Sequence, residues 1–308
     1  MRLSMKSVAK RVFLFIAVNI LVVVMISLIL NILGVRPYLT QNGINYEALM
    51  AFCLIWGMGG AFISLALSKI MAKWLMGVQV IDPDRAQGAE RELINTVYSL
   101  ARNAGLPKMP EVGIYRSNEV NAFATGPTRA RSLVAVSSGM LSRMNSDEVA
   151  AVLAHEVSHV SNGDMVTMTL LQGVINAFVM FFARILAYAV SRMTSRNDES
   201  STVGSGILYT VLVFVFEIVF MVLGSLVIAA FSRFREYRAD AGGARLVGRD
   251  KMVQALKALE RTIEVRDPRA EQPAFQAFKI SDGKSVMRFF ASHPPLKERI
   301  MRLEKGIL

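Results

Sequence analysis

Four long apolar runs constrain the fold of this chain more than any other feature of its sequence. Each run reaches about 20 residues, the length that an α-helix needs to cross a bilayer. Backbone polar groups in lipid must be satisfied within the segment itself, so runs of this length predict transmembrane helices. The first run follows a basic segment but lacks a cleavage-site pattern, which predicts an uncleaved anchor. The runs cover Phe13–Leu33, Ala48–Ile70, Met165–Val190 and Ile207–Phe231.

Polar side chains occur in the third and fourth runs, where a charge is costly. If these two runs form a membrane hairpin, Arg184 and Glu217 could pair across it. Alternatively, Arg184 extends toward the interface, and Glu217 is protonated or faces another helix. In a further alternative, both runs are buried helices of a soluble part, but their length argues against it.

Basic residues beside the runs predict how the spans are oriented. The net charge is +11, and 53% of the residues are apolar. Because many Lys and Arg residues flank the apolar runs, the charge favours anionic lipid over nucleic acid as a partner. The positive-inside rule then places the polar segments 75–164 and 232–308 in the cytoplasm and the loop 191–206 outside. The single cysteine, Cys53, excludes an internal disulfide and a cysteine zinc cluster.

The sequence HEVSH at residues 155–159 is a candidate metal motif. On a helix, His155 and His159 lie roughly 40° apart on one face, so both imidazoles can bind one zinc ion. Glu156 can then reach a water on that metal, as in metalloproteases. The alternative is a helix with two solvated histidines, and a third ligand would weaken that alternative.

Glu236 is the best candidate for this third ligand, because catalytic zinc keeps three protein ligands and one water. It lies on a predicted helical continuation of the fourth span, and Asp240, one turn later, could accept a hydrogen bond from a ligating imidazole. The two intervening spans return the chain to the side of His159. Alternatively, Glu236 only neutralises neighbouring arginines, and the rival ligand is His293, whose proline-rich setting suggests a loop or helix entry.

The polar segments together predict one α+β domain. Helices are expected over Gly88–Ala104, from Asn145 or Ser146 to Asn162–Gly163, and over Lys251–Glu260 and Leu296–Glu304. Strands are expected over Val112–Tyr115, Asn121–Thr125 and Leu133–Ser137, with a turn between the last two. Arg299 is predicted to be a solvated helix residue that could also reach the cleft. The expected organisation is a tail and hairpin at 1–74, catalytic parts at 75–164 and 232–308, and a second hairpin at 165–231.

The order of three motifs resembles the HtpX family, bacterial membrane zinc endopeptidases related to the CAAX prenyl proteases. These motifs are NAFATG at 121–126, HEVSH followed by VSNGD, and EYRAD at 236–240. The resemblance implies a multi-pass protein of the bacterial cytoplasmic (inner) membrane, with a role in quality control and stress response. It implies zinc ligands His155, His159 and Glu236, with Glu156 as the base and His293 as an electrophile near the cleft. It further implies a substrate-binding strand of Asn121, Ala122, Phe123 and Ala124.

The sequence therefore predicts an integral membrane α-helical protein of four spans with a cytoplasmic α+β zincin-type metalloprotease domain. One Zn²⁺ per chain would activate water with Glu156 as general base. The expected partners are the lipid bilayer and membrane-protein or unfolded polypeptide substrates, and no nucleic acid. One alternative is a prenyl-protein protease, but such an enzyme would need an enclosed intramembrane chamber for a lipidated tail, and four spans are too few to form one. Another is a non-catalytic membrane metal sensor or transporter, which would hold its ligands at bilayer depth.

Overall fold

The computed structural model describes residues 43–195, 202–264 and 293–307, together with Leu28, Ile32 and 39–40. The predicted first span therefore lies outside the described residues, apart from two positions. Within the described part, contacts divide the chain into two compact units. The first comprises the chain up to Ser64 together with Met168–Ile228, and the second comprises Leu65–Thr167 and the chain from Ala229 onward.

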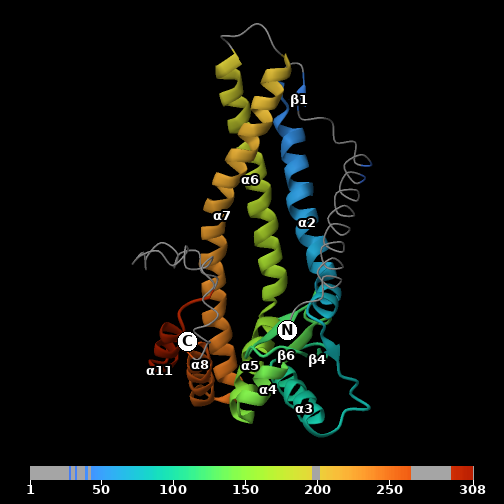
Figure 1. The fold of residues 1–308 in the computed structure, drawn as a ribbon, viewed down its shortest axis with the longest axis vertical. Helices are drawn as coiled ribbons and strands as arrows, with labels where there is room; N and C mark the ends of the chain where they lie inside the picture. Colours follow the sequence, from blue (N-terminus) through green and yellow to red (C-terminus); the bar gives the residue numbers. More distant parts are fainter. Residues whose placement is uncertain are drawn as a thin grey trace. The chain divides into compact units, whose positions relative to one another are not determined.

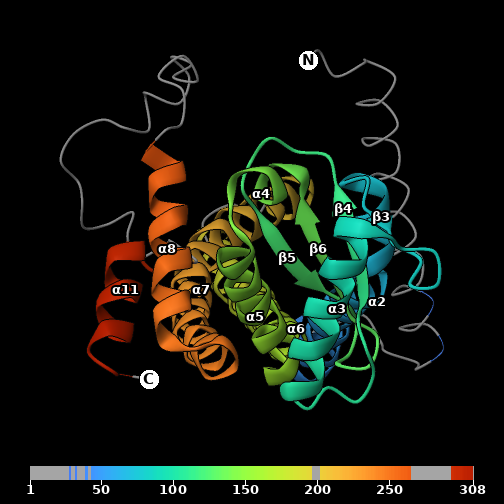
Figure 2. The same ribbon diagram turned by 90° about the horizontal axis from the view of Figure 1, so that it is seen from below.

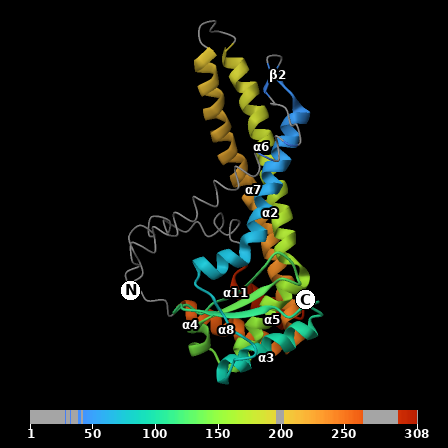
Figure 3. The same cartoon turned by 90° about the vertical axis from the view of Figure 1, so that its right-hand side faces the viewer.

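Long apolar helices dominate the first unit. These helices are α2 (Tyr46–Leu75), α6 (Asp164–Ser195) and α7 (Thr202–Val247). A hairpin of β1 (Leu39–Thr40) and β2 (Gly43–Ile44) precedes α2. The three helices lie side by side in Figures 1 and 3. By length and composition, all three could cross a membrane. The second, third and fourth predicted runs thus form such helices, and the total of four spans stays a prediction.

The surface of α7 argues against burial of the fourth run in a soluble domain. Its large apolar side chains remain exposed, including Ile207 at 63% and Phe214 at 64% of their surface. A soluble protein rarely exposes so continuous an apolar surface, whereas lipid solvates it.

Close packing of α2 on α6 depends on Gly57. A Cβ atom at this position would lie 2.6 Å from the backbone nitrogen of Ala177 and 2.7 Å from the carbonyl oxygen of Gly173. Small residues allow membrane helices to approach closely, as the glycines of this run predict. Gly60 differs, because the space around its Cβ position is open.

The second unit is built on a four-stranded sheet in the order β3-β4-β6-β5. Its strands are β3 (Gln79–Val80), β4 (Glu111–Tyr115), β5 (Ala122–Thr125) and β6 (Leu133–Ser137). The two central strands, β4 and β6, are parallel, and β3 and β5 pair antiparallel with them. Among the described strands, β5 is therefore an edge strand, which leaves one side of its backbone available to another chain.

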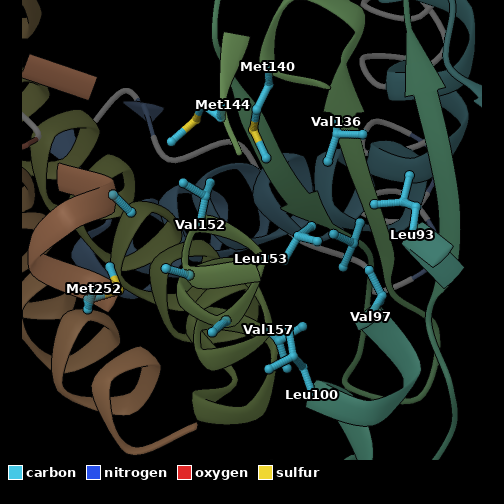
Figure 4. Close-up of a cluster of buried hydrophobic side chains, with 14 of the residues drawn as sticks. Leu93, Val97, Leu100, Val136, Met140, Met144, Val152, Leu153, Val157 and Met252 are labelled. Carbon is cyan, nitrogen blue, oxygen red and sulfur yellow. The ribbon is translucent and has the colours of Figure 1, made fainter. Parts of the chain in front are cut away.

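Helices cover one face of this sheet and build outward from it. α3 (Gly88–Asn103), α4 (Ser138–Arg143) and α5 (Ser146–Asn162) pack on the sheet, and α8 (Arg249–Glu264) packs on α5. The last helix, α11 (Leu296–Glu304), packs on α8, as Figure 2 shows. Figure 4 shows the core between these layers, where side chains of α3, β6, α4, α5 and α8 converge. The expected helices and strands are thus confirmed, with ends that differ by a few residues.

Strand β6 shows how the alternation of side chains gives the sheet two buried faces. Val134 and Val136 belong to the core beneath α3 and α5, whereas Leu133 and Ala135 pack with Tyr115 on the opposite face. Successive side chains of a strand point to opposite faces, so a strand buried on both sides is apolar throughout. This burial fixes β6, which in turn positions the edge strand β5 beside α5.

Candidate metal centre

Local capping interactions fix the two ends of α5, the helix that carries the HEVSH motif. Asn145 accepts a hydrogen bond from the Glu148 backbone N–H, and the Glu148 carboxylate accepts one from the Asn145 backbone N–H. This reciprocal capping box defines the start of the helix. Gly163 ends it with a φ of 71°, a left-handed conformation that favours glycine.

Three candidate ligands converge from α5 and α7. The ligand atoms of His155, His159 and Glu236 all lie within 4.8 Å of one another, and the three residues are buried. Glu236 reaches the histidines because α7 continues as a helix through this residue to Val247. Its Oε2 lies 3.4 Å from His155 Nε2, and its Oε1 lies 3.3 Å from His159 Nε2. The two Nε2 atoms lie 3.1 Å apart and face the carboxylate.

Carboxylates behind the imidazoles decide which ring nitrogen is available. His155 Nδ1 lies 2.9 Å from Asp240 Oδ1, and His159 Nδ1 lies 2.7 Å from Asp164 Oδ2. A carboxylate accepts the Nδ1 proton, which leaves the Nε2 lone pair free for a metal. Each histidine therefore has its own orienting aspartate, and both Nε2 atoms point to the same place.

The aspartates are held in turn by arginines. Arg299 donates to both oxygens of Asp240, from Nη2 at 2.5 Å and from Nε at 2.7 Å, and the Arg299 side chain is only 8% exposed. The prediction that Arg299 is a solvated residue was therefore wrong, because Asp240 on α7 draws its guanidinium into the core. Arg238 Nη2 contacts Asp164 Oδ1 at 3.0 Å but is nearly half exposed.

Asp164 is a site residue that sequence reasoning missed. It is the first residue of α6 and follows Gly163 directly, so the left-handed turn brings it back toward the helix that carries His159. It lies five positions after that histidine in the sequence. An acidic residue just after the glycine stop was the available signal, although its spacing differs from the one-turn interval that singled out Asp240.

The charges of the cluster favour a bound cation. Burial alone would raise the pKa of Glu236, but its close contacts with the imidazoles of His155, His159 and His293 outweigh burial and hold that pKa far below its usual range. Burial lowers the pKa of His155, but Asp240 and Glu236 reverse this and raise it to about 9. The pKa of His159 is also raised, because Asp164 and Glu236 outweigh burial. The buried carboxylates thus favour positive charge at the imidazoles of the metal-free protein.

A catalytic metal fits these residues. Glu236 Oε2 is buried and makes no well-aligned hydrogen bond among the described residues, which suits an oxygen that binds a cation. Two imidazoles and one carboxylate form the donor set of several catalytic zinc sites. His293, in contrast, is outside the group of converging ligands. Its side chain is 65% exposed, with Nδ1 at 3.0 Å from Glu236 Oε2.

A cavity of about 430 Å³ opens onto the cluster. Glu156, His293 and Arg299 contribute to its wall, and α8 supplies an apolar part. The lining also includes four consecutive residues of the edge region, Asn121, Ala122, Phe123 and Ala124. The structure thus brings every predicted site residue to one cavity or, for Asp240, directly behind it.

Ser137 fixes the start of the edge strand. Its Oγ accepts a hydrogen bond from the Asn121 backbone N–H at 3.1 Å and donates one to the Glu119 carbonyl at 2.6 Å. The same oxygen caps α4 by accepting from the Met140 N–H at 3.0 Å. This buried hydroxyl therefore ties the strand beside the cavity to the helix that follows β6.

Comparisons with known proteins found a matching family, similar sequences and a similar fold. The sequence pattern of peptidase family M48 matches residues 87–307. The protein named Protease HtpX homolog from Bacillus licheniformis is 52% identical over 303 residues, covering 96% of this chain and 99% of that protein. The one from Bacillus subtilis is 50% identical with the same coverage. The crystal structure of S. mikatae Ste24p has a TM-score of 0.65 at 17% identity, over 97% of this chain and 66% of that chain, which shows a shared fold.

Proposed function

The chain belongs to peptidase family M48 and is a membrane metalloprotease, and from this premise we propose that it is a zinc endopeptidase that degrades misfolded or damaged membrane proteins. His155, His159 and Glu236 hold the zinc ion. The observation that carries the proposal is the convergence of these three ligands within 4.8 Å in a buried cluster. Membership of a peptidase family also decides against a non-catalytic metal sensor or transporter.

Glu156 acts as general base in the proposed hydrolysis. When bound, zinc supplies Lewis acidity that lowers the pKa of water toward about 7. Glu156 lies next to His155 and lines the cavity, so its carboxylate can take a proton from the attacking water and pass it to the leaving amine. His293 also lines the cavity and can donate a hydrogen bond to the oxyanion that develops on the scissile carbonyl.

Strand β5 supplies the substrate-binding edge. Asn121, Ala122, Phe123 and Ala124 line the cavity, and β5 pairs only with β6 among the described strands. An extended substrate can add to the free edge through main-chain hydrogen bonds, which recognise backbone rather than side chains. Such recognition suits an enzyme that acts on many unfolded polypeptides.

The membrane arrangement remains that proposed from the sequence. The parts 75–164 and 232–308 form the catalytic domain in the cytoplasm, and 1–74 and 165–231 form two hairpins in the bacterial inner membrane. Cysteine labelling tests this in a Cys53→Ala background. Met193, which is 76% exposed, should react as Met193→Cys from outside the cell, and Arg85→Cys should react only from the cytoplasm. Cytoplasmic labelling at both positions would contradict the second hairpin.

A cleavage assay in detergent tests the chemistry. Glu156→Gln should keep zinc and lose about 10²–10⁴-fold in turnover of an unprenylated membrane-protein substrate. Glu90→Gln, an exposed change on α3, is the matched control and should retain activity. Near-normal turnover by the Glu156 variant would refute its role as base, and an absolute need for a prenylated substrate would favour a prenyl-protein protease.

A further inference from the structure

The first unit contains a cavity of about 700 Å³ whose lining shares no residue with the cavity at the metal centre. Residues of α2, α6 and α7 line it, and these are the helices of the described chain that are long and apolar enough to cross a membrane. Its volume falls within the range of ligand sites, about 300–1,000 Å³. Polar groups at membrane depth are costly, so several in one cavity indicate a binding function. Its polar lining comprises Trp56, Gln172, Asn176, Arg184, Glu217 and Ser225.

An ion pair joins the walls of this cavity. Arg184 Nη1 donates to Glu217 Oε1 at 2.6 Å and to the Met180 carbonyl at 3.0 Å. The same guanidinium lies 5.5 Å from the centroid of the Phe52 ring. One side chain thus contacts α2, α6 and α7, and the pairing that the sequence allowed is present. These charged groups hold the walls together.

Other polar groups of the lining have unused hydrogen-bonding capacity. Gln172 Nε2 donates to Asn176 Oδ1 at 2.9 Å, which leaves one acceptor on Gln172 and donors on Asn176 without a partner among the described residues. The indole Nε1 of Trp56 is buried and has no acceptor in the described chain. The cavity therefore offers donors and an acceptor to a guest from the apolar phase.

We propose that this cavity binds a transmembrane segment of a substrate through a hydrogen-bonding side chain such as Asn or Gln. A lipid chain makes no hydrogen bond, whereas an amide supplies both the acceptor and the donor that the cavity requires. An assembled membrane protein buries such side chains between its own helices. Their exposure to lipid marks a misassembled protein. This inference rests on the proposed function and adds the feature by which substrates are selected.

Two single-span reporters test the proposal in proteoliposomes that contain the full-length protein. The reporters share one cleavable tail and differ only in an Asn or a Leu at the centre of the span. Because a hydrogen bond between membrane helices strengthens association about three- to tenfold, the Asn reporter should have a KM lower by that factor. Equal KM values would overturn the proposal. Glu156→Gln should abolish cleavage of both reporters, and if it does not, the proposed function itself fails.

Variants of the cavity test whether it is the source of the preference for the Asn reporter. Gln172→Leu/Asn176→Leu should bring the ratio of the two KM values to about one, because Leu cannot form the hydrogen bonds. Thr210→Leu, an exposed change on α7 outside the cavity, should keep the ratio. Bound zinc per chain verifies that each variant is folded. If the double variant retains the preference, selection occurs elsewhere and the proposal is wrong.

Cross-linking identifies the occupant directly. In a Cys53→Ala background, Ile175→Cys places a thiol in the cavity wall. It should form a disulfide with a cysteine beside the central Asn of the reporter, and more weakly with the Leu reporter. A disulfide instead with cysteines introduced into residues 13–33 of the same chain, undiminished by substrate, would show that the protein fills its own cavity and would overturn the proposal.

Discussion

Replacing Arg299 by Leu should destabilise the catalytic unit strongly. Arg299 forms a bidentate ion pair with Asp240, and the two side chains are only 8% and 4% exposed. Removing one partner of a buried pair costs about 3–5 kcal/mol, because the other charge stays buried and uncompensated. The melting temperature of a domain of 150–250 residues changes by about 2–4 °C for each kcal/mol of unfolding free energy. The melting temperature of the metal-free variant should therefore fall by about 6–20 °C.

Thermal stability tests the role of Arg299 more directly than zinc affinity does, because the substitution has two opposing effects on zinc affinity. Loss of the guanidinium removes a positive charge near the cation, which favours binding. The same loss frees Asp240 to move or take up a proton, which weakens its hold on His155 and costs about 10–100-fold in affinity. Thermal unfolding in detergent, followed by intrinsic fluorescence, separates stability from these effects.

Two further variants make the Arg299 experiment decisive. Lys297→Leu removes an exposed charge from the same helix and should leave the melting temperature within about 2 °C of wild type. Arg299→Lys keeps the charge but loses the planar fork, so it should fall between the wild type and the Leu variant. If Arg299→Leu has the same melting temperature as the Lys297 control, the buried pair does not stabilise the catalytic unit as argued.

Four further outcomes are expected. Glu236→Ala should lose bound zinc and activity, whereas His293→Ala should keep zinc and turn over slowly, and elemental analysis showing the reverse would make His293 the third ligand. Asp164→Asn should weaken zinc binding about 10–100-fold in chelator competition, and unchanged affinity would remove Asp164 from the site. Gly57→Ala should lower the melting temperature of the first unit, since its Cβ would meet backbone atoms at 2.6 and 2.7 Å, and an unchanged value would contradict this packing. The raised pKa of His155 stabilises the metal-free protein fully below about pH 6.5, and this contribution should disappear as the pH rises through about 9, so a flat melting curve over that range would refute the charge balance.

Local signals were sufficient to predict most of the secondary structure. Asn145 and Gly163 bound the HEVSH helix because capping and left-handed termination depend on neighbouring residues alone. The three predicted strands, β4, β5 and β6, follow from short runs with β-branched and aromatic residues between turn residues. The position of Glu236 could be predicted because one helix carries it on from an apolar span.

Features that depend on distant partners could not be predicted in the same way. Arg299 lies 59 residues from Asp240 in sequence, so helical periodicity gives no sign that the two side chains meet. The pairing of Arg184 with Glu217 also remained open. The depth of each residue along its helix does not determine the rotation of the helix about its axis, and so does not show whether the two side chains face each other. Sheet order was equally hidden, since the parallel pairing of β4 with β6 places β5 at the edge although it lies between them in sequence.

The contact between Arg299 and Asp240 also has a consequence for how the enzyme is made. During synthesis the histidine ligands leave the ribosome long before α11. Glu236 follows only after α6 and most of α7 have been synthesised. Arg299, which secures Asp240, emerges only 59 residues after Asp240. A nascent chain therefore lacks a finished active site while it and its neighbours are still unfolded and vulnerable to cleavage. A chain truncated before Leu296 should accordingly remain inactive toward an unfolded protein substrate even when zinc is supplied.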